Sequence, residues 1–127
     1  METRMTHHIM RAALPLLCFA LTASVTPALA QQAPSIQVGS DTRAKSEAEC
    51  LKDAKFAITE TGFGVTFTSG PHIGGAGALN GVGAAVIVTC LSQGARTFIE
   101  VVGTSLDGNV AGEARNRVRT ITMGPPS

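Results

Sequence analysis

The sequence predicts an α+β domain over residues 46–123, a two-layer sandwich with a three-stranded antiparallel sheet and two helices on one face (order αβββα). Apolar residues recur at helical spacing in residues 46–61 and 107–123. Between these segments, three runs are rich in β-branched or alternating apolar residues, which indicates strands. The sheet face without helices is expected to be partly covered or to act as a contact surface.

The first helix is predicted from a capping box and an apolar face. Ser46 stands three residues before Glu49, so each side chain can satisfy a free backbone donor at the helix start. Five residues fall on one side at helical spacing: Cys50, Leu51, Ala54, Ala57 and Ile58. Gly62 suits the left-handed conformation that commonly ends a helix.

The strands are predicted at residues 63–69, 82–92 and 96–104. Val65 and Phe67 alternate with polar residues or glycine, which is typical of a half-buried strand. The last two strands form a hairpin around a turn at residues 92–94. In its first strand, Val86, Val88 and Cys90 are expected to face the core, with Ile87 and Leu91 on the other face.

Residues 70–83 contain six glycines and one proline, and we interpret them as a connecting loop. They lack the third glycine of a dinucleotide-binding loop and the lysine of a phosphate-binding loop. Ligand contact and membrane contact remain as alternatives for this segment.

The second helix and the ends of the domain complete the expected organisation. Asp107 offers a capping side chain, and Val110, Ala114, Val118 and Ile121 form one apolar stripe. Residues 31–45 are expected to be a flexible leader, in which residues 36–38 could add a short edge strand. Residues 124–127 are expected to be a disordered tail.

Residues 1–30 have the pattern of a secretory signal peptide. Arg4 and Arg11 precede an uncharged apolar stretch, and small residues at Ala28 and Ala30 precede Gln31. The stretch is shorter than the roughly 20 residues that span a bilayer, which disfavours a membrane anchor. We therefore expect cleavage between Ala30 and Gln31, a periplasmic or secreted protein, and no stable membrane insertion afterwards. Translation could start at Met1 or at Met10.

Composition excludes some classes of partner. The chain has 127 residues, enough for one small domain. From Gln31 onward the basic and acidic residues balance, and there is no Trp or Tyr to stack on bases. We therefore expect no nucleic-acid partner.

Cys50 and Cys90 are the two cysteines that remain after signal removal, and they are expected to form a structural disulfide. An exported chain meets an oxidising compartment, and the apolar helix face could bring Cys50 to the strand that holds Cys90. Redox pairs are usually close in sequence, whereas these two are 40 residues apart. A thiol-redox or metal-dependent factor using Cys50, Cys90 and His72 remains an alternative, although a zinc site usually has four ligands.

No catalytic residue, metal or cofactor is predicted. His72 is the only histidine after Gln31, and no serine lies in a nucleophile-elbow motif. Arg115, Arg117 and Arg119 on the last helix are either a solvated face or, with His72, a binding surface for an anion such as a lipid headgroup, a polysaccharide or an acidic partner.

Four segments carry a resemblance: Ala48-Glu49-Cys50-Leu51, the strand that ends Val86-Ile87-Val88-Thr89-Cys90, Phe98-Ile99-Glu100-Val101-Val102-Gly103, and Ala114-Arg115. The chain resembles small exported bacterial proteins of uncharacterised function with a helix-to-strand disulfide. The resemblance covers residues 46–123 and implies a fold and a compartment, without catalytic residues. We expect an exported binding or interaction protein of the bacterial envelope, whose partner is another envelope protein. A membrane-associated structural protein is a further alternative.

Overall fold

The computed structural model describes residues 32–125, which belong to one compact unit. Along the chain it contains strand β1 (Ser35–Arg43), helix α1 (Glu47–Glu60), strands β2 (Gly64–Ser69), β3 (His72–Leu79), β4 (Val82–Gln93) and β5 (Arg96–Ser105), and helix α2 (Gly108–Met123). The predicted signal peptide, residues 1–30, lies outside the described residues, as do residues 126–127 of the predicted tail.

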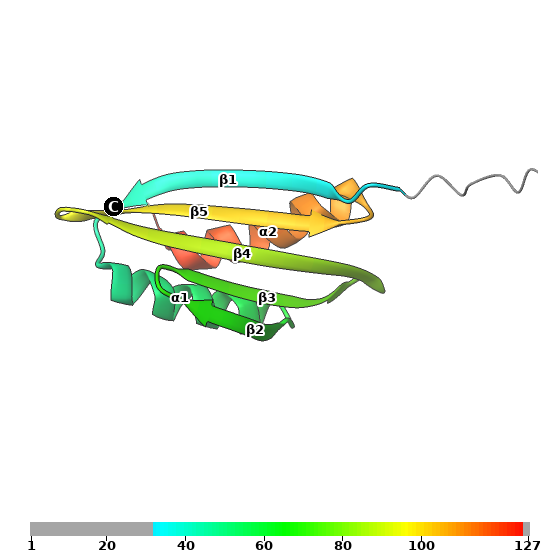
Figure 1. Cartoon of the computed structure of the whole chain (residues 1–127), viewed down its shortest axis with the longest axis horizontal. Helices are drawn as coiled ribbons and strands as arrows, with labels where there is room; N and C mark the ends of the chain where they lie inside the picture. The colour runs from blue at the N-terminus through cyan, green and yellow to red at the C-terminus, as the bar shows by residue number, and fades with distance from the viewer. Residues whose placement is uncertain (1–31, 126–127) are drawn as a thin grey trace, which may run out of the picture. The chain divides into compact units, whose positions relative to one another are not determined.

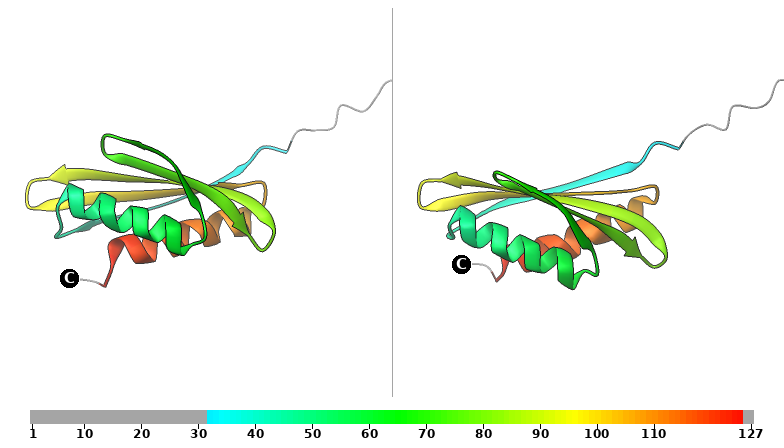
Figure 2. Two further views of the ribbon diagram at one scale, coloured as in Figure 1. Left: turned by 90° about the horizontal axis from the view of Figure 1, so that it is seen from below. Right: turned by 60° about the horizontal axis from the view of Figure 1, so that its bottom comes forward.

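The five strands form one antiparallel sheet in the order β1-β5-β4-β3-β2 (Figure 1). Both helices lie on the same side of it, which confirms an α+β fold with its helices in one layer (Figure 2). The predicted three-stranded sheet is wrong, because the sheet has two further strands. One, β1, occupies most of the segment expected to be a flexible leader. The other, β3, occupies the glycine-rich segment expected to be a loop.

The β3 strand exists because its small residues let neighbouring groups approach the backbone. A Cβ at Gly75 would collide with Ile58 of α1, and one at Gly77 would collide with Phe63. A tight turn at Asn80 and Gly81, both with positive φ, then returns the chain into β4. Gly75 and Gly77 therefore let β3 pack closely against α1 and against Phe63, which follows the helix.

The core lies between the sheet and the helices, as the helical periodicity predicted. Ser46 caps α1 with both halves of the capping box present, and Asp107 caps α2. The predicted helix faces and inward strand residues provide most of the buried set: Cys50, Ala54, Ala57, Ile58, Val86, Val88, Cys90, Val110, Ala114 and Val118. Ile73 of β3 and Ile99 and Val101 of β5 complete the centre of this core.

The β2 strand departs from its predicted half-buried state, since every one of its residues is exposed. It is the outermost strand on its side, and its pairing with β3 shifts register between Val65 and Phe67. The Phe67 ring lies over Gly74, where any side chain on the glycine would collide with it.

Candidate functional site

Cys50 and Cys90 form the predicted disulfide, which joins the first turn of α1 to β4 with a Cα–Cα distance of 6.0 Å. Neither cysteine has exposed surface. Thiol–disulfide exchange needs an attacking thiolate to reach a sulfur, so the native fold blocks exchange at this pair. The arrangement suits a structural cross-link.

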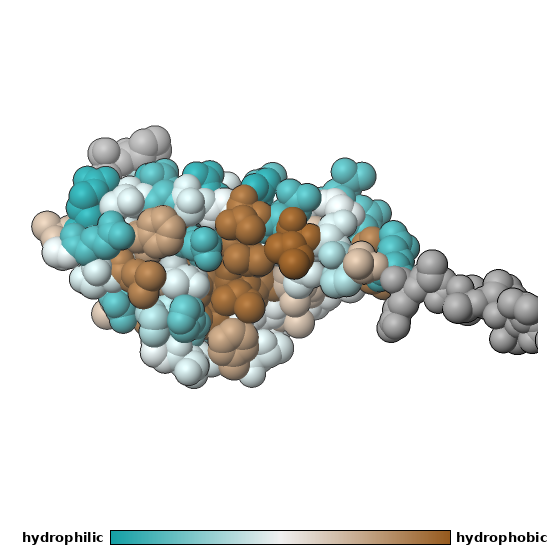
Figure 3. Space-filling model, turned by 45° about the horizontal axis from the view of Figure 1, so that its top comes forward, coloured by the Kyte–Doolittle hydropathy of each residue, from teal (hydrophilic) through white to brown (hydrophobic). Residues whose placement is uncertain are grey.

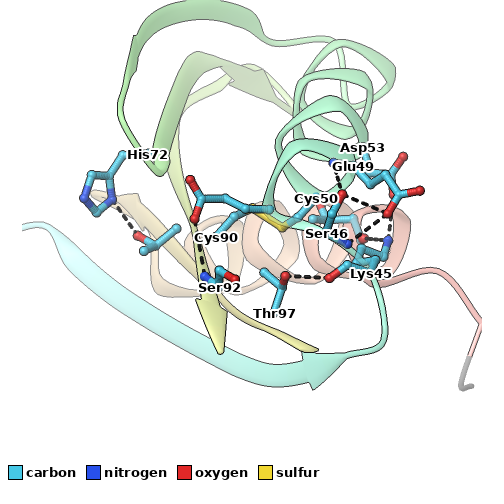
Figure 4. Close-up of a disulfide and its surroundings, with 12 residues drawn as sticks. Lys45, Ser46, Glu49, Cys50, Asp53, His72, Cys90, Ser92 and Thr97 are labelled. Atoms are coloured by element: carbon cyan, nitrogen blue, oxygen red, sulfur yellow. Dashed lines mark hydrogen bonds and ion pairs between the residues drawn. A yellow bond between two sulfur atoms is a disulfide. The ribbon is translucent and has the colours of Figure 1, made fainter. Parts of the chain in front are cut away.

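Polar contacts hold the same end of α1 to the rest of the domain (Figure 4). The Thr97 hydroxyl donates to the Lys45 carbonyl at 2.6 Å, and the Lys45 ammonium donates to Asp53 and to the Thr122 carbonyl. The Ser92 amide donates to Glu47 at 3.3 Å. The disulfide therefore lies within a set of contacts that fix where α1 begins.

His72 lies at the start of β3, with its Nδ1 3.0 Å from the Thr89 hydroxyl (Figure 4). The structure does not bring it to either cysteine, because His72 is exposed while the disulfide is buried. Among the described residues, no group of three or more His, Cys, Asp or Glu side chains could hold a metal ion. The alternative that combines Cys50, Cys90 and His72 thus has no shared site within residues 32–125.

The arginines of α2 lie against the chain's own edge strand. Arg115 donates to the Val38 carbonyl at 2.8 Å, and Arg119 donates to the Ser40 carbonyl at 3.5 Å. From the β5 side, Arg96 donates to the Thr42 carbonyl at 3.1 Å. Three alternate carbonyls of β1 are therefore bound by guanidinium groups, which protects this edge against pairing with another strand.

Gly39 allows this arrangement, because a Cβ there would lie 3.0 Å from Arg119 Cδ and 3.1 Å from Arg115 Cδ. The two arginine stems thus cover the β1 backbone directly. Asp41 on the same strand forms ion pairs with Arg43 and Arg119. The Thr42 amide, the Arg43 side chain and, more weakly, Arg119 hold the pKa of Asp41 below its ordinary value.

Arg117, the third predicted arginine, points elsewhere and pairs with Glu113 on the surface of α2. It lines a shallow, open groove of about 370 Å³ between the two helices. The other lining residues are Glu60, Thr61, Asn116, Thr120 and Ile121. The charges of this groove are mixed, and it has no concentration of cations for an acidic partner.

The sheet face opposite the helices carries an apolar row that crosses all five strands. The register aligns Val38 of β1, Val102 of β5, Ile87 of β4 and Gly74 of β3, with Phe67 of β2 lying over the glycine. Ile36 flanks this row on the same face, and Leu91 lies on that face as well, separated from Ile87 by Thr89. Much of this surface is exposed: Ile36 64%, Val38 50%, Ile87 42%, Leu91 42% and Phe67 41%.

Figure 3 shows the apolar row as a continuous apolar area on the side of the sheet that no described helix covers. We call this whole side of the sheet the open face. Soluble monomers seldom leave a large contiguous apolar patch exposed, and such patches commonly bind a partner. Sequence analysis predicted a possible contact surface here, but it did not identify the row, since that needed the register of β1 and β3.

A polar row runs beside the apolar row. The register places Ser40 of β1, Glu100 of β5, Thr89 of β4, His72 of β3 and Ser69 of β2 side by side. Glu100 and His72 therefore lie on either side of the central strand, one strand away from it. The row gives the open face polar groups that can fix the orientation of a partner.

Comparison of the chain with protein-family models, curated proteins and solved structures found no match. Membership of a group of small exported proteins therefore stays a prediction, as do cleavage before Gln31 and a periplasmic or secreted location. Within residues 32–125, neither helix has the length and apolar character needed to cross a membrane.

Proposed function

We propose that the chain is an exported binding protein of the bacterial envelope, and that it binds another protein through the open face. The observation that carries this proposal is the exposed apolar row across five strands. Burial of apolar area is the main driving force of protein association, and this row offers it without unfolding any described element.

The nature of the face favours a protein as the occupant over a small molecule. Ligand sites for small molecules are concave, whereas the open face is one side of a sheet. Its apolar centre, bordered by Ser40, Glu100 and Thr89, resembles the apolar core and polar rim of a protein interface. The buried disulfide supports a stable scaffold rather than a redox role.

The test places a photo-crosslinking residue at Ile87 of the exported protein and, as a control, at Phe56, an exposed apolar residue on α1. We expect protein crosslinks at Ile87 and few at Phe56. The partner, identified by mass spectrometry, must then bind the purified protein with an affinity that Ile87→Lys reduces at least about tenfold and Phe56→Lys leaves unchanged.

Two results would contradict the proposal. One is the absence of protein crosslinks at Ile87 under conditions where the chain is exported. The other is binding that Ile87→Lys leaves intact while Arg117→Glu abolishes it, which would move the interface to the helix layer. The mass of the exported chain tests the expected start at Gln31 in the same preparation.

A further inference from the structure

We propose that the protein bound at the open face is a second copy of this chain, so that two sheets pack face to face in a twofold-symmetric dimer. This inference rests on the proposed function, because it names the partner of the same face. It is argued from the extent of the face and from the way its rows match themselves under a twofold rotation.

The open face is large enough for a stable interface. Five strands at about 4.8 Å each make a sheet about 24 Å wide, and β4, with 12 residues, is about 40 Å long. Even with β2 and β3 shorter, this extent is comparable to the roughly 800 Å² that each partner of a standard interface buries. Two such sheets can pack about 10 Å apart with their strands nearly aligned.

The strand order makes the apolar row complementary to itself. β4 is the middle strand, with two strands on each side of it. Consider a twofold axis that runs parallel to β4 and lies between the two sheets. Rotation about this axis places the β2–β3 side of one sheet over the β1–β5 side of the other, and it keeps each row of side chains opposite the same row of the second copy. Ile87 then contacts Ile87 of the second copy, and the Phe67 end of one apolar row covers the Val38 end of the other.

The polar row matches itself under the same rotation. Thr89 lies near the axis, and His72 and Glu100 lie on opposite sides of it. Rotation brings His72 of each copy toward Glu100 of the other, which creates two equivalent contacts between a basic and an acidic side chain. Isologous interfaces have this property, that residue i contacts j and j contacts i.

An unrelated protein would need its own apolar row and its own pair of matching charges. A second copy already has both in the required places. The sheet edge at β1 is bound by Arg96, Arg115 and Arg119, which protects this edge against pairing with a strand of another chain and leaves the face exposed.

Sedimentation equilibrium of the exported, purified protein over a wide concentration range tests the dimer. We expect a monomer–dimer equilibrium, and we expect Ile87→Lys to raise the dissociation constant at least about tenfold. Phe56→Lys is the matched control, because it makes the same change on the helix layer and should leave the dimer unchanged. Thermal unfolding followed by circular dichroism verifies that each variant is folded.

A charge exchange tests the predicted arrangement of the two copies. His72→Glu places two acidic groups opposite each other and should weaken the dimer about tenfold. The double variant His72→Glu with Glu100→His exchanges the two groups and should restore most of the affinity. A dimer that forms by another surface has no reason to be rescued by this exchange.

Crosslinking at Ile87 separates this inference from the proposed function. Crosslinks between two β4 segments support the dimer. A monomer at all concentrations that crosslinks at Ile87 to a different protein would overturn the dimer and leave the proposed function in place. A monomer with no crosslink at Ile87 would overturn both the dimer and the proposed function. A crosslink from Ile87 to residues before Gln31 of the same, uncleaved chain would also overturn the dimer.

Discussion

The two faces of the sheet differ in what covers them, although they are built from alternate residues of the same strands. On β4, Val86, Val88 and Cys90 are buried beneath the helices, while Ile87 and Leu91 on the opposite face are exposed. Both sets are aliphatic or sulfur-containing, so composition does not distinguish them. The helix-covered face therefore provides the core, whereas the open face leaves its apolar side chains exposed.

The two edges of the sheet differ in a similar way. Three carbonyls of β1 are bound by Arg96, Arg115 and Arg119, and this edge also carries Asp41 and Arg43. Along β2 there is no charged residue, and its protection comes from its short length and from the irregular pairing between Val65 and Phe67. Within residues 32–125, side-chain hydrogen bonds thus protect the β1 edge and not the β2 edge.

The largest expected effect is loss of the disulfide that joins the covered face to α1. The double change Cys50→Ala with Cys90→Ala opens a loop with a sequence separation of 40, and it should lower the free energy of unfolding by about 4 kcal/mol. Urea unfolding of the variant and of wild type measures this loss. Wild type kept reduced should match the variant, and a loss below about 1 kcal/mol would contradict a structural role.

The next effect compares neighbouring residues on opposite faces of β4. Val88→Ala removes atoms from the fully buried core and should cost about 2 kcal/mol of unfolding free energy. Ile87→Ala removes atoms from the open face and should stay within about 0.5 kcal/mol at protein concentrations low enough to dissociate the proposed dimer. Equal losses in denaturant titrations of the two variants would mean that the open face is already covered in the monomer.

Sequence analysis predicted both helices and the β4–β5 hairpin because each has a strong local pattern, and it predicted the disulfide because two cysteines remain after the expected signal removal. It missed β3, because glycine and alanine have too little side chain to show the alternation of a strand. A usable signal was nevertheless present: Asn80-Gly81 is the dipeptide that favours a tight hairpin turn, and both residues adopt positive φ. Giving that dipeptide more weight would have predicted the β3–β4 hairpin.

The reason for missing most of β1 is different. Its apolar residues Ile36 and Val38 face away from the helices, while Gln37 and Gly39 face α2. This inverts the usual rule that the apolar side of a strand faces the core, because two arginines of α2 cover this part of the sheet. Contacts between residues that are distant in sequence, such as those of Arg115 and Arg119 with β1, produce no residue pattern in either segment from which the strand could be predicted.

Removal of an arginine should weaken the protected edge. Arg115→Ala takes away the donor to the Val38 carbonyl and should lower the free energy of unfolding by about 1 kcal/mol. Arg117→Ala is the matched control, since its pair with Glu113 lies on the surface of one helix and contributes about 0.3–0.5 kcal/mol. Denaturant unfolding measures both, and a larger loss for Arg117 would show that the arginines do not act through β1.

The smallest expected effect is the dependence of stability on pH through two carboxylates, the partly buried Asp41 and the exposed Glu49. The pKa of Asp41 is lowered chiefly by the Thr42 amide, and the pKa of Glu49 is lowered chiefly by the Ser46 amide. Because the unfolded chain takes up these protons first, the stabilisation is complete above the ordinary pKa values of 3.8 and 4.5. It is lost as the pH falls from there through the lowered values of the folded state.

Thermal unfolding of wild type and of Asp41→Asn and Glu49→Gln from pH 7 to pH 2 measures this contribution. Each variant should lose less stability than wild type as the pH falls, because one linked proton has been removed. Glu60→Gln is the control, since Glu60 is exposed at the C-terminal end of α1, away from the β1 edge and the α1 cap. If the Glu60→Gln profile were flattened as much as that of Asp41→Asn, the acid sensitivity would not be specific to the protected edge.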